Sequence, residues 1–213
     1  MPIRHHCPPP TPFLSFLKRN DCILYSPLSQ TDTTDWISGN QIIPYGNGSM
    51  TWDSARSIWK FQKLSSQSYG TNSWFAKWQL KIPIEQQEIS WSCCVELFAY
   101  YYTYNYYSAY ETLPTRSAMW SLHGTYNQLT QSAHSHGSEN NRTIWKGYKN
   151  GTQVYTYTYS SIRQLIYTTD ICIGMRPNSD SQFSGPYGIR NIAIFAKTFS
   201  LNDINEYFAL LPS

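Results

Sequence analysis

Tyrosine is the chemistry-bearing side chain that this sequence concentrates most strongly. The 213 residues include 18 tyrosines, and seven of these fall between positions 100 and 110. A tyrosine combines a broad apolar ring with a hydroxyl group, so a dense tract suits either rings packed on one another along a strand or a platform for a ligand or partner. Both interpretations stay open at this stage. The candidate contact residues are Tyr104, Tyr106, Tyr107, Tyr110 and Trp120.

Histidine and cysteine occur in two short groups that contain metal-ligand types. His134 and His136 would point to one side of a strand, but a metal needs more ligands than these two, and the neighbouring sequence offers no further set. The segment 132–141 is rich in serine, glycine and asparagine, which predicts a solvated loop. His5, His6 and Cys7 stand beside three prolines, and we interpret them as part of a flexible arm.

Alternation of apolar and polar residues predicts β-strands along much of the chain. Segment 74–82 places apolar side chains on one face and mainly lysine and glutamine on the other. Further strands are expected at 22–28, 89–102, 117–123 and 143–149. Asn150-Gly151 precedes another β-prone segment, 154–158, and predicts a tight hairpin, because a type I′ turn needs positive φ at both central residues.

The last forty residues predict a buried strand followed by one short helix. Residues 188–197 are largely apolar on both faces, as expected for a strand inside a sandwich. Ser200 is expected to cap the helix, with Asp203 three residues on, where a carboxylate favours a helix N-terminus. The predicted buried stripe of this helix comprises Leu201, Ile204, Tyr207 and Phe208.

Residues 1–20 differ in composition from the rest of the chain. Prolines at 2, 8, 9, 10 and 12 lack amide donors and favour a polyproline II path. Apolar side chains follow them, so the segment is either a linker or an anchor that docks into a neighbouring subunit. We therefore expect an extended arm over 1–20 and one domain over 21–213. The candidate anchoring residues are Pro8, Pro9, Pro10, Phe13, Leu14, Phe16 and Leu17.

Composition favours one all-β domain and argues against several function classes. Only 14% of residues are charged while 16% are aromatic, and the length suits a single domain. The net charge of +3 comes from scattered basic residues, so no nucleic-acid partner is expected. No apolar run is long enough for a membrane span, and no signal peptide is apparent, which favours synthesis in a cytoplasm. Five cysteines, an odd number, indicate mainly reduced thiols.

Five short segments near the two ends of the chain share a recognisable order. They are Leu24-Tyr-Ser-Pro-Leu28, Tyr148-Lys-Asn-Gly-Thr-Gln-Val154, Ile171-Cys-Ile-Gly174, Phe183-Ser-Gly-Pro-Tyr-Gly-Ile-Arg-Asn-Ile192 and Phe199-Ser-Leu-Asn-Asp-Ile-Asn-Glu206. Together they resemble the motifs of laminin-G-like domains, which have the concanavalin A-like fold. The resemblance covers the ends of the chain better than the middle. It implies a two-sheet antiparallel jelly-roll sandwich with a short C-terminal helix, in a family that mostly binds glycans, proteins or structural partners.

The resemblance also bears on catalysis and on metals. Glucanases of the same fold carry a Glu-x-Asp-x-Glu strand whose carboxylates act as nucleophile and acid. The 13 acidic residues here never fall at that spacing, so we expect no enzyme of this type and no catalytic residues. Calcium is the one cofactor that the resemblance allows, and turn formation is the alternative role of the aspartates involved. The candidate ligands are Asp32, Asp35, Asp170 and Asp180.

Two functions are consistent with these patterns. Low charge, abundant tyrosine, asparagine and threonine, and a missing signal peptide resemble bacteriophage virion proteins. The first hypothesis is therefore a non-enzymatic decoration, fibre or tail-attached subunit of a virion, made in the host cytoplasm and joined to itself or to other virion proteins by residues 1–20. The alternative is a free carbohydrate-binding lectin domain that stacks tyrosine or tryptophan on the sugar rings of surface glycans.

Overall fold

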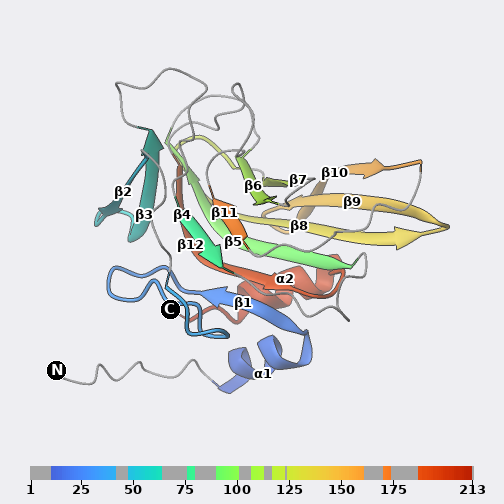
Figure 1. Ribbon diagram of the computed structural model, residues 1–213, viewed down its shortest axis with the longest axis horizontal. Helices are drawn as coiled ribbons and strands as arrows, with labels where there is room; N and C mark the ends of the chain where they lie inside the picture. Colours follow the sequence, from blue (N-terminus) through green and yellow to red (C-terminus); the bar gives the residue numbers. More distant parts are fainter. Residues whose placement is uncertain are drawn as a thin grey trace.

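The chain forms two antiparallel sheets in the computed structural model (Figure 1), which describes residues 11–41, 48–63, 76–79, 90–100, 107–112, 117–122, 124–160, 170–173 and 187–212. The larger sheet has eight strands in the order β10-β9-β8-β5-β12-β3-β2, with β1 also paired to β12. The smaller sheet has the order β4-β11-β6-β7. This arrangement confirms the predicted all-β jelly-roll sandwich.

The elements of the described residues follow one another along the chain with a helix near each end. Their bounds are α1 Thr11–Arg19, β1 Cys22–Ser26, β2 Gly48–Asp53, β3 Ile58–Lys63, β4 Ala76–Gln79, β5 Trp91–Ala99, β6 Tyr107–Thr112, β7 Ser117–Leu122, β8 Leu129–Glu139, β9 Arg142–Lys149, β10 Thr152–Thr158, β11 Asp170–Ile173, β12 Tyr187–Phe195 and α2 Leu201–Ala209.

One face of the larger sheet, called here the helix face, is covered by α1 and α2. Cys94, Ala133 and Ala193 project from three neighbouring strands into a core that the two helices complete. Figure 1 shows the N-terminal elements in blue and the C-terminal elements in red drawn together on this side. The helices contribute four aromatic and two aliphatic side chains to this core. They are Phe13, Phe16, Tyr207 and Phe208, with Leu17 and Ile204. The core of this face therefore joins the two ends of the sequence.

The extended arm predicted for residues 1–20 is wrong for residues 11–19, which form α1. Pro12 lies in the first turn, where a missing amide hydrogen costs no intrahelical hydrogen bond. Phe13, Phe16 and Leu17 follow at helical spacing and are buried within the chain's own core. Leu14 is half-buried. Burial against β1, β12 and α2 is thus the physical reason for the helix, and Pro8, Pro9 and Pro10 lie outside the described residues.

The loop after β1 closes the outer edge of that strand. The backbone amide of Tyr25 donates to Asp35 Oδ1 at 2.9 Å, and the amide of Trp36 donates to the Tyr25 carbonyl oxygen at 2.8 Å. Asp35 also accepts from the amides of Ile37 and Ser38 and from the Ser38 hydroxyl. The buried carboxylate of Asp35 and the amide of Trp36 thus pair with the backbone groups of Tyr25, which would otherwise lie unpaired at this sheet edge.

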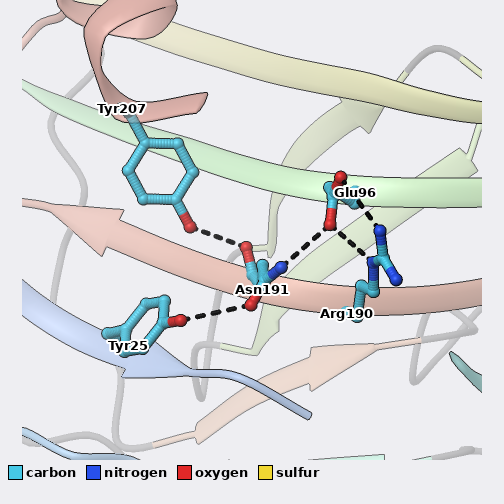
Figure 2. A network of polar contacts seen from close by, with 5 residues as sticks. All are labelled: Tyr25, Glu96, Arg190, Asn191 and Tyr207. Carbon is cyan, nitrogen blue, oxygen red and sulfur yellow. Dashed lines mark hydrogen bonds and ion pairs between the residues drawn. The ribbon is translucent and has the colours of Figure 1, made fainter. Parts of the chain in front are cut away.

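A polar network centred on Asn191 joins β1, β5, β12 and α2 (Figure 2). The pairing of β12 with β5 shifts register between Arg190 and Ala193, and Asn191 takes a φ of 51° there. At this bulge the Asn191 amide group accepts from the Tyr25 hydroxyl at 3.1 Å and donates to Glu96 Oε2 at 2.8 Å. The Tyr207 hydroxyl donates to the Asn191 carbonyl oxygen at 2.7 Å.

Charge completes this network. Arg190 Nε donates to Glu96 Oε2 at 2.6 Å, so the mostly buried carboxylate of Glu96 has both a cation and an amide as partners. Burial raises the pKa of Tyr25 and of Tyr207, so both phenols keep the protons that they donate. Each buried polar group of the network has a partner, as low local dielectric demands.

Most predicted elements of the second half are present. The Asn150-Gly151 turn has positive φ at both residues, 47° and 72°, and joins β9 to β10 as predicted. Ser200 caps α2 in a capping box with Asp203. Leu201 is an exception, because it is 36% exposed instead of lying in the buried stripe.

The solvated loop predicted for 132–141 is also wrong, because most of it belongs to β8. Pairing with β5 on one side and β9 on the other holds these residues in a central strand. Backbone hydrogen bonds on both edges outweigh the turn-forming tendency of the local composition. The two histidines of this segment are therefore buried.

Removing the Phe16 ring should destabilise the whole domain, since it packs edge-on against Phe195 and Phe199. We expect Phe16→Ala to lower the free energy of unfolding by about 3–5 kcal/mol. Urea unfolding followed by tryptophan fluorescence measures this. Ser15→Ala, at an exposed position of the same helix, is the control and should change stability by less than about 0.5 kcal/mol. Equal stabilities of the two variants would contradict the placement of α1.

The bulge predicts different costs for two substitutions of Asn191. Both Asn191→Ala and Asn191→Gly remove the hydrogen bonds to Tyr25 and Glu96, which should cost at least about 1 kcal/mol. Alanine should cost about 1 kcal/mol more than glycine, because only glycine adopts the positive φ without strain. Urea unfolding of both variants measures the difference. If alanine were as stable as glycine, backbone conformation would not be the constraint at this position.

Candidate functional site

Two rows of cross-strand neighbours place aromatic and imidazole groups on the face of the larger sheet opposite the helices. In the first row, Trp91, His136, Trp145 and Tyr157 are successive partners across β5, β8, β9 and β10. In the second row, Cys93, His134, Gly147 and Tyr155 are partners in the same order. Cross-strand partners share one face, so these side chains form one surface. We call it the aromatic–histidine surface, and Tyr159 completes it.

The inner part of this surface is a stack of Trp91 on two imidazoles. The centroid of the Trp91 indole lies 5.2 Å from that of His134 and 5.3 Å from that of His136, with interplanar angles of 25° and 20°. All three side chains are buried. Trp145 then meets both histidines with centroid separations of 5.6 Å. The imidazoles are therefore held rigidly between two indoles.

The outer part of the surface is accessible to solvent. Trp145 packs edge-on against Tyr159 at 4.9 Å, and Tyr159 packs edge-on against Tyr157 at 4.7 Å. Trp145 and Tyr159 are half-buried, and Tyr157 is 54% exposed. Rings thus run from the buried stack out to the edge strand β10.

Gly147 of β9 leaves room for the Tyr155 ring of β10 to lie across β9 and reach His134 of β8. A Cβ atom at this position would lie 1.9 Å from Tyr155 Cε1, so only glycine leaves room for the ring that crosses it. The Tyr155 hydroxyl consequently reaches His134 Nδ1 at 2.7 Å. This hydrogen bond couples the half-buried edge tyrosine to the buried imidazole. The Nε1 atom of Trp145 is buried and has no hydrogen-bond partner among the described residues.

The chemistry available here is stacking and hydrogen bonding. Phenol, indole and imidazole groups offer ring faces together with donors and acceptors. Among the described residues of β5, β8, β9 and β10, both carboxylates, Glu96 and Glu139, lie on the helix side by strand alternation. The one cation that alternation places on the aromatic–histidine side is Lys149, next to the hairpin turn. The described side chains of this surface are therefore largely without formal charge.

The predicted tyrosine contacts are placed only in part. Tyr107 and Tyr110 lie in β6, and Trp120 lies in β7 opposite Ala109. The backbone of β7 contacts β8 and β9, which brings the strand of Trp120 next to the aromatic–histidine surface. Tyr104 and Tyr106 lie outside the described residues. The contact role of all five residues stays a prediction.

Sequence reasoning missed the aromatic–histidine surface itself. Strand pairing brings together residues up to 66 positions apart, from Trp91 to Tyr157, and no local motif announces it. One signal was present in the sequence, namely the period-two spacing of His134 and His136. The polar composition of residues 132–141 nevertheless led us to assign this segment to a loop.

Two of the four candidate calcium ligands, Asp32 and Asp35, organise the loop after β1. Asp32 Oδ1 accepts from the amide of Thr34, and Asp32 Oδ2 accepts from Trp36 Nε1 at 2.8 Å. Asp35 accepts hydrogen bonds on both oxygens, as described above. Asp170 lies in β11 and Asp180 lies outside the described residues. Within the described ranges, no three histidine, cysteine or acidic side chains gather as a metal site would require.

A second polar cluster lies where the β2–β3 hairpin meets the end of β5. The Arg56 guanidinium lies 4.6 Å from the Phe98 ring centroid and 5.4 Å from that of Tyr100. The Tyr100 hydroxyl donates to Asp53 Oδ2 at 2.5 Å, and Arg56 pairs with the same oxygen at 2.9 Å. The Tyr100 hydrogen bond, followed by the Arg56 contacts, holds the pKa of Asp53 below its usual value.

Other reactive groups of the described chain are unsuited to chemistry. Cys22, Cys93 and Cys94 are thiols, and burial raises the pKa of each, so none is a ready nucleophile.

Neither α1 nor α2 has the length and apolar character needed to cross a bilayer.

Comparisons with known proteins identify the fold and no family. No family model and no curated sequence matches the chain. Among solved structures, the binding domain of botulinum neurotoxin DC in complex with rat synaptotagmin II matches 90% of this chain, with 12% identity and a TM-score of 0.60. A structure of botulinum neurotoxin type C, whose cell entry depends on interaction with two ganglioside molecules, matches the same share with 16% identity and a TM-score of 0.56.

A third structure covers the length of its own chain. Domain 4 of AbnA, a GH43 extracellular arabinanase from Geobacillus stearothermophilus, was solved in complex with arabinotriose and matches 88% of this chain and 98% of that one, with 12% identity and a TM-score of 0.52. The neurotoxin matches cover only 52% of their own chains, so this protein spans about half of their length. These likenesses establish a β-sandwich fold.

The hydrogen bond between Tyr100 and Asp53 gives a prediction for acid titration. Tyr100→Phe should raise the pKa of Asp53 toward about 3.9, because the largest cause of the lowered value is removed. The depressed pKa stabilises the fold above the ordinary carboxyl pKa, and this contribution is lost as the pH falls through that range. The variant should therefore lose less stability on acidification. Carboxyl NMR titration measures the pKa, and an unchanged value for Asp53 would contradict the assigned bond.

Proposed function

We propose that this protein is a non-enzymatic carbohydrate-binding module that holds glycans on its aromatic–histidine surface. The observation that carries the proposal is the continuous set of rings from the buried Trp91 stack to the exposed Tyr157. Rings held rigidly lose little freedom when they bind a sugar, which favours affinity. The arabinanase domain solved with arabinotriose and the ganglioside-dependent neurotoxin domain support the proposal at the level of fold.

The chemistry of the surface favours neutral sugars. A pyranose or furanose ring presents apolar C–H groups to an aromatic face and hydroxyls around its rim. Trp145 and Tyr157 supply ring faces, and the Tyr155 hydroxyl supplies a polar group beside them. No described carboxylate on this side of the four strands would repel a ligand or need a cation. Recognition rests on stacking and neutral hydrogen bonds.

A virion role is a separate proposal that concerns location and not the binding chemistry. The side chains of Phe13, Phe16 and Leu17, once candidates for anchoring, pack within this chain. An anchor would therefore have to use other residues. A glycan-binding module on a particle surface would satisfy both hypotheses, because a virion subunit can also hold host glycans.

Loss of the Trp145 ring should weaken glycan binding by about tenfold or more, since a central aromatic contact contributes roughly 2 kcal/mol or more. Calorimetric titration with a panel of neutral oligosaccharides that includes arabinotriose, alongside sialylated counterparts, measures binding by the native chain and by Trp145→Ala. Gly147→Ala is a second variant, which displaces the Tyr155 ring without removing an aromatic group.

Trp52→Ala is the matched control. Trp52 is also a half-buried tryptophan with an edge-on aromatic neighbour, Trp59, but it lies in β2 at the other end of the sheet. The Trp52→Ala substitution should leave the glycan affinity unchanged. If the control weakened binding as much as Trp145→Ala, or if no sugar of the panel bound the native chain, the proposed site would be wrong.

A further inference from the structure

Two cations lie against one tyrosine ring beside the β2–β3 turn. Lys60 Nζ is 4.7 Å from the centroid of the Tyr100 ring, and the guanidinium carbon of Arg56 is 5.4 Å from the same centroid. The Arg56 guanidinium also lies 4.6 Å from the Phe98 ring centroid. Each contact attracts a cation to the face of a ring. The two cations repel each other, and the shared Tyr100 ring nevertheless keeps them close together.

Packing and one hydrogen bond fix the position of the Tyr100 ring. A Cβ atom at Gly188 of β12 would lie 3.3 Å from Tyr100 Cε2, so the missing side chain lets the ring approach that strand. Phe98 packs edge-on against the ring at 4.8 Å, and the Tyr100 hydroxyl donates to Asp53 Oδ2. Phe98 is 6% exposed, and Ile58 beside Gly188 is fully buried. The cations thus lie next to apolar groups, where charges act more strongly than in bulk water.

The charges of this group are unequal. We call it the cation–ring cluster, and its members are Asp53, Arg56, Lys60, Phe98 and Tyr100. Asp53 Oδ2 pairs with Arg56 at 2.9 Å, and the lowered pKa of Asp53 keeps this carboxylate ionised at neutral pH. Glu96, on the same face of β5 as Phe98, is engaged by Arg190. The five side chains of the cluster therefore carry one positive charge in excess.

Solvent reaches the cluster, which lies on the helix side of the larger sheet. The Arg56 side chain is 41% exposed, and Lys60 is half-buried. Phe98 projects to the same face as Cys94, by strand alternation, and so away from the aromatic–histidine surface. A guanidinium has five N–H donors in one plane, and Asp53 uses the Nη1 group of Arg56. The other donors of Arg56 and the ammonium of Lys60 suit an oxyanion, which accepts several such bonds.

We infer that the cation–ring cluster binds an oxyanion group of the sulfate, phosphate or carboxylate class. Arg56 supplies planar donors, and Lys60 supplies the second positive charge. Tyr100 positions both cations, while the carboxylate of Asp53 opposes the ligand and limits its affinity. This site is separate from the proposed glycan surface, because it lies on the other face of the sheet and selects charge. A free anion and an acidic sugar present the same group, and the titrations below distinguish them.

Two substitutions should move the affinity for sulfate in opposite directions. Lys60→Gln should weaken binding by about tenfold or more, because a charge-assisted contact is lost, whereas Lys60→Arg keeps the charge and the affinity. Asp53→Asn should strengthen binding by about threefold or more, because it removes a repelling charge. Loss of structure weakens binding, so it does not produce the gain expected at Asp53. NMR titration of the isotope-labelled full-length chain with sodium sulfate, at constant ionic strength, gives the affinities.

Arg19→Gln serves as the control. Arg19 is also an exposed arginine that pairs with a carboxylate, that of Glu206, and its guanidinium lies 5.2 Å from the Phe16 ring centroid. The described contacts of Phe16 include this one cation, whereas those of Tyr100 include two. The substitution should therefore leave the affinity for sulfate unchanged.

Parallel titrations with glucose and a glucose sulfate identify the source of the anion. Tighter binding of the glucose sulfate than of sulfate would support an acidic sugar as the ligand, and equal binding would support a free anion. A native chain that does not respond to sulfate, equal losses in Lys60→Gln and Arg19→Gln, or no gain in Asp53→Asn would overturn the inference. Trp145→Ala should keep its affinity for sulfate, so failure here is distinct from failure of the proposed glycan surface.

Discussion

The arrangement of the larger sheet depends on the hydrogen bonds that meet at Asn191. Its positive φ gives β12 the bulge that lets this strand pair with β5 in two registers while β1 pairs on its other edge. A bulge of this kind leaves polar atoms inside the sheet, and a buried unpaired group costs more than a single hydrogen bond returns. Tyr25, Glu96 and Tyr207 supply the missing partners from three other elements. One side chain therefore specifies how four elements fit together.

The two faces of the larger sheet present different side chains. The helix face holds one hydrophobic core, whose aromatic groups come from α1, α2 and the strands beneath them. The opposite face carries the aromatic–histidine surface, where burial decreases from Trp91 to Tyr157. Strand alternation makes this separation possible, because neighbouring residues such as Ala133 and His134 serve opposite faces.

The sequence predicted the elements whose signals are local. The Asn150-Gly151 turn and the Ser200 cap were found because backbone geometry at these places demands particular residues. Helix α1 was missed because prolines dominate its approach, although Phe13, Phe16 and Leu17 have helical spacing. Strand β8 was missed because serine, glycine and histidine favour turns, and its identity comes from partners on both edges. The candidate site depends on those same long-range pairings, so no local pattern predicted it.

The union of the first and last elements in one core has a consequence for synthesis of the chain. Phe16 of α1 packs against Phe195, Phe199 and Tyr207, and a ribosome releases these partners almost two hundred residues later. The helix face of the nascent sheet therefore stays open until β12 and α2 have been made, and closing it requires contacts of very large sequence separation, which form slowly. During that interval Phe13 has the Tyr25 ring of β1 as a partner, whereas Phe16 lacks its three aromatic neighbours.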